Sequence, residues 1–310
     1  MAMMSPEKFV VIDYSGTLSL EAPRFGRPEN LGRALEESGL AALGVSAPEI
    51  FWGDIVNPTW IEGSTTSIGY TRVMADRIAA LRLAPDAPKS EIGAAASRFV
   101  AMYLACSRID PHWRPILVRL SEHPAAIMVV ATDHYAEATG KITDYLDSLG
   151  ISAGKIGKGG GLAFPSVSSR AEDTNKNLFP TPHIESSATV ARSGNTASRI
   201  FVANSADLGV WKADRCFWEI LKSQLPLETV RRILLIDDFG FNEEAGDSYG
   251  GRAKVMARQE KTVANLGETF RATVEVAPFY LPEKVGDCEE AGAGLIAETA
   301  VRIDEFLERT

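Results

Sequence analysis

Residues 9–18 run Phe9-Val10-Val11-Ile12-Asp13-Tyr14-Ser15-Gly16-Thr17-Leu18, an apolar stretch that ends abruptly on a carboxylate. Four apolar residues before a turn sequence are typical of a buried parallel strand. Such a strand would bring Asp13 to the carboxyl edge of its sheet, where the ligand sites of open α/β sheets lie. An aspartate shortly before a glycine also occurs in ordinary turns, so this segment alone leaves both interpretations open.

Further apolar runs alternate with segments of helical periodicity in the rest of the chain. We expect strands at Ala125–Ala131, Arg199–Ala203 and Arg231–Ile236, and helices at Tyr135–Leu149 and Asp214–Leu225. Alternating strands and helices are typical of an α/β fold with a Rossmann-like, doubly wound parallel sheet. The acidic pair Glu243-Glu244 is predicted to lie in the first turn of a helix, where the helix dipole favours negative charge.

Two segments interrupt this alternation. Residues 20–124 contain no strand pattern, and their periodicity predicts helices at Asn30–Gly39, Thr66–Leu83, Ser90–Arg108 and Pro111–His123. A helical bundle inserted between two strands is therefore expected. Residues 155–198 are rich in Gly, Ser, Thr, Pro and Asn and have no sustained period, which predicts a flexible flap or a small β excursion.

Composition narrows the classes of function. The 310 residues carry 32 Lys and Arg against 41 Asp and Glu, and this excess of acids argues against a protein that binds nucleic acid. The three cysteines (Cys106, Cys216 and Cys288) lack CxxC spacing, so neither a disulfide framework nor a zinc site is indicated. With no leader sequence and no apolar run long enough to span a bilayer, we expect a cytoplasmic protein that does not bind membranes.

The polar residues that follow the expected strands suggest one chemistry. Asp13, Thr132 and the pair Asp237-Asp238 each follow a strand, and Lys212 precedes a helix. At one edge of a sheet they would form a single pocket suited to phosphoryl transfer. A carboxylate can accept the phosphoryl group, while magnesium (Mg²⁺) bound by carboxylates offsets the negative charge.

These residues occur in the order found in the haloacid dehalogenase (HAD) superfamily, which the chain resembles. Its first motif, Asp-x-Asp-Gly-Thr-Leu after an apolar strand, is matched at residues 13–18, and its second, a strand ending in Ser or Thr, is matched at Thr132. The lysine motif is matched by Gly209-Val210-Trp211-Lys212-Ala213-Asp214, and the strand that ends in paired acids by Asp237-Asp238. Together the four motifs cover both halves of the chain outside the insertions.

The resemblance implies a domain organisation and a role for each matched residue. It implies a HAD-like core from 1–19 and 125–310, with 155–198 as a flexible insertion, and a helical C1-type cap from 20–124 that closes over the pocket. Asp13 would be the nucleophile and a magnesium ligand, together with the backbone carbonyl of Ser15 and with Asp238, which Asp237 supports. Thr132 and Lys212 would hold the transferred phosphoryl group. The role of Asp133 stays open.

Ser15 departs from the family pattern, because phosphatases of this family carry a second aspartate at that position. The missing aspartate would protonate the leaving oxygen and activate water, a contribution of about 10²–10⁴-fold. The expected function is Mg²⁺-dependent hydrolysis of a small phosphorylated metabolite, with an acid borrowed from the cap or flap or with a substrate that has a good leaving group. If the chain instead binds a phosphorylated ligand and turns it over slowly, Ser15→Asp would raise its phosphatase activity.

Other functions stay open at this stage. One alternative is a weakly active protein that binds a phosphorylated ligand or partner. Relatives that cleave carbon–phosphorus bonds use a cap lysine, and Lys89 is the only lysine between Ser19 and Ala125. Relatives that cleave carbon–halogen bonds lack the paired acids that this chain retains. His134, next but one to Thr132, could reach the pocket.

Residues near the pocket also have ordinary structural interpretations. The aromatic residues Trp52, Trp60, Trp113 and Tyr70 are expected to serve core packing. Arg24 and Arg27, which follow the first motif, are expected at the surface.

Overall fold

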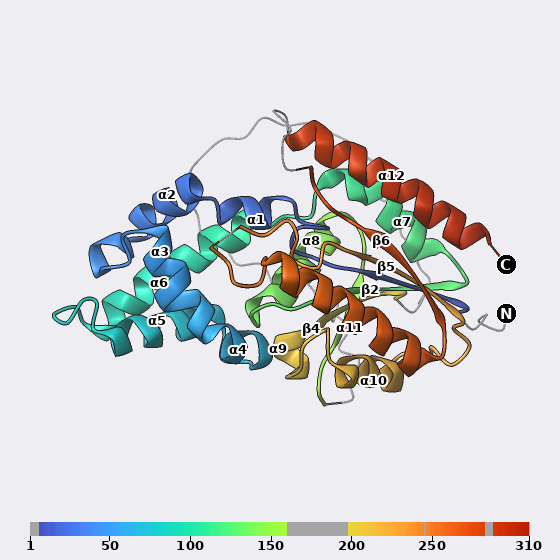
Figure 1. Ribbon diagram of the computed structural model, residues 1–310, viewed down its shortest axis with the longest axis horizontal. Helices are drawn as coiled ribbons and strands as arrows, with labels where there is room; N and C mark the ends of the chain where they lie inside the picture. Colours follow the sequence, from blue (N-terminus) through green and yellow to red (C-terminus); the bar gives the residue numbers. More distant parts are fainter. Residues whose placement is uncertain (1–5, 160–197, 245, 283–287, 310) are drawn as a thin grey trace, which may run out of the picture.

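The computed structural model of the protein describes residues 6–159, 198–244, 246–282 and 288–309. Its centre is a six-stranded, all-parallel sheet with the order β3-β4-β2-β1-β5-β6 (Figure 1). The strands are β1 (Lys8–Ile12), β2 (Ala126–Thr132), β3 (Ala153–Ile156), β4 (Ile200–Asn204), β5 (Arg232–Asp237) and β6 (Thr273–Pro278). The α/β class and the parallel sheet expected from the sequence are confirmed.

Strand β1 is buried along its whole length because both faces of the sheet are covered by helices. Val10 and Ile12 pack against α7 (Arg114–Glu122), α8 (Glu137–Ser148) and α12 (Cys288–Glu308) on one face. Phe9 and Val11, which point the opposite way, pack against α10 (Arg215–Gln224) and α11 (Arg252–Phe270). Figure 1 shows α12 and α7 on one side of the strands and α10 and α11 on the other. This alternation explains why the strand is apolar from Phe9 to Ile12.

A separate group of helices follows β1 and precedes the helix that leads into β2. Its members are α1 (Glu21–Phe25), α2 (Pro28–Ser38), a short 3₁₀ turn η1 (Ala41–Leu43), α3 (Pro48–Ile50), a π-helical segment η2 (Phe51–Val56), α4 (Asn57–Thr65), α5 (Tyr70–Leu81) and α6 (Lys89–Cys106). We call residues 21–106 the helical region. It has its own hydrophobic core, built around side chains such as Leu35, Phe51, Ile78 and Phe99. A second 3₁₀ turn, η3 (Pro111–Trp113), connects it to α7.

Most of the expected elements lie within a few residues of their observed bounds. Strands β3 and β6 and helices α11, α12 and α4 were not anticipated. Arg252 begins α11, so residues 243 and 244 lie in the preceding loop and the prediction of a helix start there is wrong. The expected flap at 155–198 begins inside β3, where Lys155 pairs with Val202 of β4, and residues 160–197 of that segment lie outside the described part of the chain.

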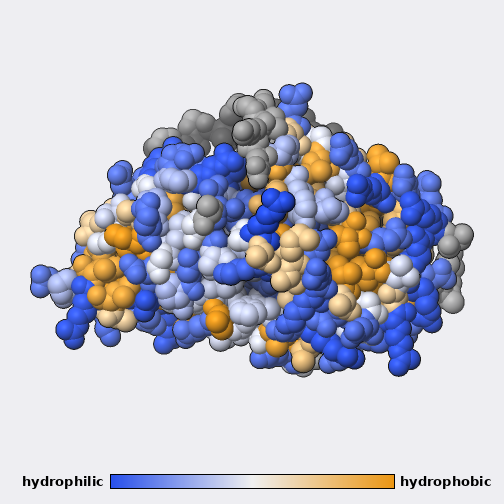
Figure 2. Space-filling view, in the orientation of Figure 1, coloured by the Kyte–Doolittle hydropathy of each residue, from blue (hydrophilic) through white to orange (hydrophobic). Residues whose placement is uncertain are grey.

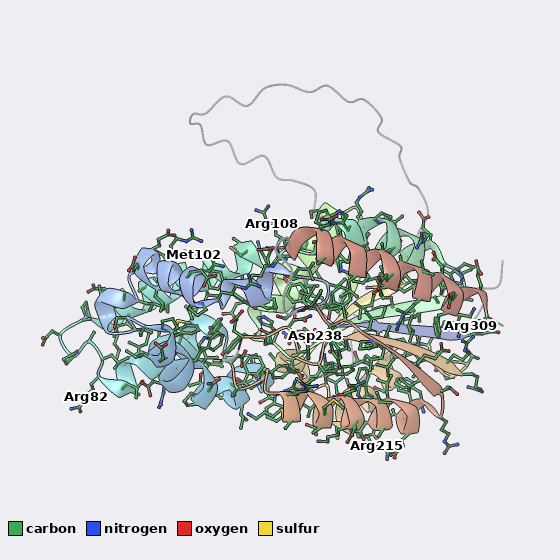
Figure 3. All side chains as sticks on the ribbon, turned by 45° about the horizontal axis from the view of Figure 1, so that its top comes forward. Arg82, Met102, Arg108, Arg215, Asp238 and Arg309 are labelled. Carbon is green, nitrogen blue, oxygen red and sulfur yellow. The ribbon has the colours of Figure 1, made fainter. Side chains whose placement is uncertain are left out.

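The exterior of the protein is shown by its hydropathy and by the character of its helices. Most of the visible face is hydrophilic, and a hydrophobic area lies between α11 and α12, where Figure 1 shows the edge strand β6 (Figure 2). Among the helices that the structure describes, none combines the length and apolar character that crossing a membrane requires. Figure 3 places Asp238 between the helical region, marked by Arg82 and Met102, and the part that contains the sheet, marked by Arg215 of α10 and by Arg309 after α12.

Candidate active site

The topology brings the expected site residues to one point of the sheet. The chain leaves β1 toward β2 on one side and leaves β5 toward β6 on the other, so the adjacent strands β1 and β5 form a topological switch point. Ligands of open α/β sheets bind in the crevice that such a point creates at the carboxyl ends of the strands. Asp13 directly follows β1, Asp237 is the last residue of β5, and Thr132 is the last residue of β2.

Three carboxylates meet at this switch point. Asp13, Asp237 and Asp238 are buried, and each offers an oxygen within 4.8 Å of an oxygen on the other two. The ammonium of Lys212 contacts two of them, with Nζ 2.6 Å from Oδ1 of Asp13 and 2.7 Å from Oδ2 of Asp237. Lys212 lies in the loop between α9 (Ser205–Leu208) and α10. The sequence prediction that these four residues share one pocket therefore agrees with the geometry.

One ammonium does not balance three buried carboxylates. Burial, followed by repulsion from Asp237 and Asp238, raises the pKa of Asp13 well above its usual range against the attraction of Lys212. Burial and the neighbouring Asp237 raise the pKa of Asp238 to about 7. A group of hard oxygen donors with excess negative charge is the kind of site that Mg²⁺ prefers. The donor set thus fits a divalent cation.

The loop after β5 fixes the orientation of Asp238. Its carboxylate accepts hydrogen bonds from the backbone N–H groups of Gly240 (3.1 Å) and Asn242 (2.9 Å). The Asn242 side chain in turn donates to the carbonyl oxygens of Gly16 (2.7 Å) and Phe279 (2.8 Å). Asn242 therefore ties together the loops that follow β1, β5 and β6.

Gly16 has no room for a side chain. Its φ is +76°, and a Cβ there would lie 2.6 Å from Oδ2 of Asp238. We expect Gly16→Ala to lower the free energy of unfolding by about 1–3 kcal/mol and to displace the Asp238 carboxylate. Gly150→Ala is the matched control, because Gly150 has φ +80° but nothing within 4 Å of an added Cβ. Urea titration of both variants measures the difference; equal losses would contradict the clash with Asp238.

Asp133, whose role the sequence left open, positions Lys212. One of its carboxylate oxygens accepts a hydrogen bond from the backbone N–H of Lys212 (2.8 Å), and the other accepts from the Tyr249 hydroxyl (3.1 Å). Burial raises the pKa of Asp133, although Lys212 opposes this shift. The side chain thus fixes the loop from which Lys212 reaches the carboxylates.

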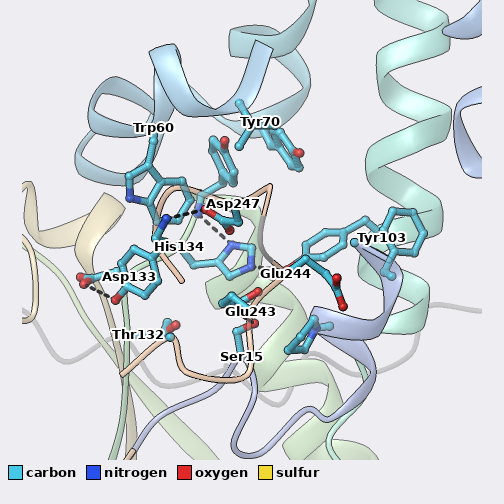
Figure 4. A pocket seen from close by; sticks show the side chains of 18 of the residues that line it. Ser15, Trp60, Tyr70, Tyr103, Thr132, Asp133, His134, Glu243, Glu244 and Asp247 are labelled. Carbon is cyan, nitrogen blue, oxygen red and sulfur yellow. Dashed lines mark hydrogen bonds between the residues drawn. The ribbon is translucent and has the colours of Figure 1, made fainter. Parts of the chain in front are cut away.

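Ser15 has an acidic partner that the sequence did not reveal. The Ser15 hydroxyl donates to Oε1 of Glu243 at 2.8 Å, and both residues line the same cavity. Figure 4 shows Glu243 next to Ser15. Burial, followed by repulsion from Asp247 and Asp238, raises the pKa of the Glu243 carboxyl well above its usual range. A carboxyl group therefore lies beside the position at which Ser15 departs from the family motif.

His134 lines the cavity, as the sequence suggested, but its ring is engaged in hydrogen bonds. Nδ1 accepts from the backbone N–H of Tyr135 (2.8 Å), and Nε2 lies 2.7 Å from the Tyr103 hydroxyl. Because Nδ1 is an acceptor, Nε2 carries the proton of the neutral ring. Burial lowers the pKa of His134 to about 4.

This low pKa makes folding stability depend on pH. In the unfolded chain His134 titrates near 6.5, so below that pH the unfolded state binds a proton that the folded state excludes until about pH 4. We expect the wild type to lose roughly 3 kcal/mol more than His134→Gln as the pH falls through this window. Denaturant titrations of both proteins at several pH values test this; parallel stability curves would contradict it. The nearby buried carboxylates are common to both proteins and cancel in the comparison.

Aromatic side chains of the helical region form much of the cavity wall. The cavity encloses about 820 Å³, including its opening to solvent. Trp52, Trp60 and Tyr70 pack in the core of the helical region, as expected, and they also line the cavity. Trp113 is a buried core residue, as expected. The expected surface position of Arg27 agrees with the structure, in which its Nε lies 3.5 Å from Oε1 of Glu244.

Comparison with known proteins adds no external identification. No family model, no curated protein and no solved structure matches this chain. Any indication of function therefore comes from the residues at the switch point, their geometry and their electrostatics.

Proposed function

We propose that the protein is a Mg²⁺-dependent hydrolase of the HAD type that removes phosphate from a small phosphorylated metabolite. The observation that carries this proposal is the buried group of Asp13, Asp237 and Asp238, contacted by Lys212 at the topological switch point. The match of Asp13, Thr132, Lys212 and the paired acids to the family motifs supports it.

Asp13 would act as the nucleophile. Its carboxylate oxygen forms a bond to phosphorus while the bond between phosphorus and the leaving oxygen breaks, which gives an aspartyl-phosphate. Lys212 and Thr132 hold the non-bridging phosphoryl oxygens during transfer. A magnesium ion bound by Asp13, Asp238, the Ser15 carbonyl and Asp237 would offset the charge on nucleophile and phosphate.

The acid and base missing at position 15 would come from Glu243. Its raised pKa favours a protonated carboxyl, which can donate a proton to the leaving oxygen. The resulting carboxylate then takes a proton from the water that attacks the aspartyl-phosphate, and this attack releases phosphate and regenerates Asp13. The Ser15 hydroxyl positions Glu243 through the 2.8 Å hydrogen bond.

The helical region would serve as the cap of this enzyme. It follows β1 in the chain, as a C1 cap does, and its residues line the cavity that lies above the carboxylates. Substrate selection would then depend on the side chains of α1, η2, α4, α5 and α6.

Two chemistries of related enzymes are less well supported. Lys89, the one lysine available for a Schiff base in carbon–phosphorus cleavage, is exposed at the start of α6 and does not line the cavity. The paired acids that dehalogenases lack are buried at the centre of the site. A protein that binds a phosphorylated ligand but turns it over slowly is the remaining alternative.

Phosphate release from a panel of phosphorylated metabolites, including an acyl phosphate, tests the proposal. We expect release that requires magnesium and stops when the metal is chelated. If no compound releases phosphate while the protein still binds magnesium and phosphate analogues, the binding alternative replaces the proposed activity.

A further inference from the structure

The cavity above the carboxylates combines aromatic rings with negative charge. Seven acidic residues line it, whereas Lys212 is the only Lys or Arg among the described lining residues. His134 is neutral there because burial lowers its pKa to about 4. A second anionic group on the substrate would therefore meet repulsion at this wall with no described cation to receive it.

Four rings of the wall are arranged around one another at close range. Tyr70 and Tyr135 stack with centroids 3.8 Å apart, and Trp60 meets Tyr135 nearly at a right angle, with centroids 5.4 Å apart. Tyr103 meets Tyr70 at 88° with centroids 6.2 Å apart. The four packed side chains also line the cavity, and the part of a ring face that borders the cavity can attract an ammonium group.

Asp247 supplies a negative charge beside these rings. Asp247 lines the cavity together with the four rings, and its carboxylate accepts a hydrogen bond from the backbone N–H of Tyr249 at 2.8 Å. Figure 4 shows Asp247 with Trp60 and Tyr70, on the side of the pocket away from Ser15. Of the other two acids on this loop, Glu244 pairs with Arg27, and Glu243 bonds to Ser15.

We infer that the cavity binds an alkylammonium group between Asp247 and the rings of Trp60, Tyr70, Tyr103 and Tyr135, so that the preferred substrates are phosphate esters of amino alcohols. This inference rests on the proposed function for the phosphate end of the substrate only. The phosphate lies at the switch point, and the ammonium end extends toward the helical region. Burial raises the pKa of Asp247, although the Tyr249 N–H and the charges of Arg258 and Lys254 oppose this shift, and a bound cation would add to that opposition.

Binding of the cation alone tests the inference without phosphate, metal or turnover. Choline is compared with neohexyl alcohol, its neutral isostere in which carbon replaces nitrogen, by calorimetry on the unaltered chain. We expect choline to bind at least about 10-fold more tightly, because only the cation interacts with the ring faces and the carboxylate. Equal binding of the two probes overturns the inference.

Variants then locate the site. Asp247→Asn should remove most of the preference for choline while leaving the binding of neohexyl alcohol within about 2-fold. Asp76→Asn is the matched control, since Asp76 is an exposed carboxylate of α5 that pairs with Arg72 and does not line the cavity. Loss of the preference in Asp76→Asn and not in Asp247→Asn would contradict the assignment.

Turnover separates this inference from the proposed function. Phosphate release is measured for choline phosphate and for neohexyl phosphate in the presence of magnesium, and we expect kcat/KM to favour choline phosphate by about 10-fold or more. Tight binding of choline with no hydrolysis of any phosphate ester would overturn the phosphatase proposal and leave the cation site intact. Equal hydrolysis of both esters would support the phosphatase and overturn the cation site.

Discussion

Replacement of Asp13 by asparagine is expected to reduce phosphate release by about 10⁴-fold or more, as for removal of a nucleophile in other enzymes. The amide has nearly the same shape as the carboxylate and can still accept a hydrogen bond from Lys212, which lies 2.6 Å from Oδ1. It carries no negative charge, however, and cannot form the acyl phosphate. The measurement is kcat with saturating substrate and magnesium.

Asp214→Asn is the control for this experiment. Asp214 is an exposed aspartate next to α10 that pairs with Lys261 at 3.0 Å, so its replacement removes a charge without touching the cavity. Thermal unfolding of both variants confirms that they fold. If Asp13→Asn retains more than about a tenth of the wild-type rate, Asp13 is not the nucleophile.

Asp13 could be predicted from the sequence because a buried parallel strand has a distinctive pattern. Strands β1, β2 and β5 contain the continuous apolar runs Phe9–Ile12, Ala126–Ala131 and Ile233–Ile236, since helices cover both faces, and each run is followed by a polar residue at the carboxyl edge. Strand β6 was missed for the opposite reason. It is an edge strand, half-buried, and carries Glu275, which pairs with Arg232. Strand β3 is short and contains Gly154 and Lys155.

Glu243 could not be predicted because its position depends on the path of a loop. Phe239 and Gly240 adopt positive φ values (+53° and +82°), which turn the chain after β5 back across the carboxyl edge. The bonds of Asn242 to the loops after β1 and β6 then hold the next residue beside Ser15. None of these tertiary contacts leaves a periodic pattern in the sequence.

The expected core packing of the aromatic side chains is confirmed, but their additional place in the cavity wall could not be predicted, for a related reason. Periodicity predicts which residues of a helix share a face, but it does not specify whether that face meets another helix or an open cavity. Tyr70 of the helical region stacks on Tyr135, which lies between β2 and α8. The cavity wall therefore forms where the helical region meets the carboxyl edge of the sheet.

Glu243→Gln is expected to lower kcat by about 10²–10⁴-fold, the usual contribution of general acid–base catalysis. Glutamine keeps the size of the side chain and can still accept a hydrogen bond from Ser15. It cannot donate a proton to the leaving oxygen or accept one from the attacking water. The loss in kcat/KM, which reports formation of the aspartyl-phosphate, should be large for alkyl phosphates and small for para-nitrophenyl phosphate, whose leaving group needs no proton. The loss in kcat should appear with both, because the base is needed to hydrolyse the common intermediate. Rates for both kinds of ester, with Glu219→Gln as an exposed control on α10, measure this difference.

Combining Ser15→Asp with Glu243→Gln tests whether Glu243 replaces the missing aspartate. In the Glu243→Gln background, the new carboxyl would stand where the family carries its own acid, and we expect it to restore the rate on alkyl phosphates by at least about 10-fold. In the wild-type background it would face Glu243 at hydrogen-bond distance, and a second acid should bring little further gain. Equal gains in the two backgrounds would mean that the sites act independently, and Glu243 would then not be the replacement for the missing aspartate.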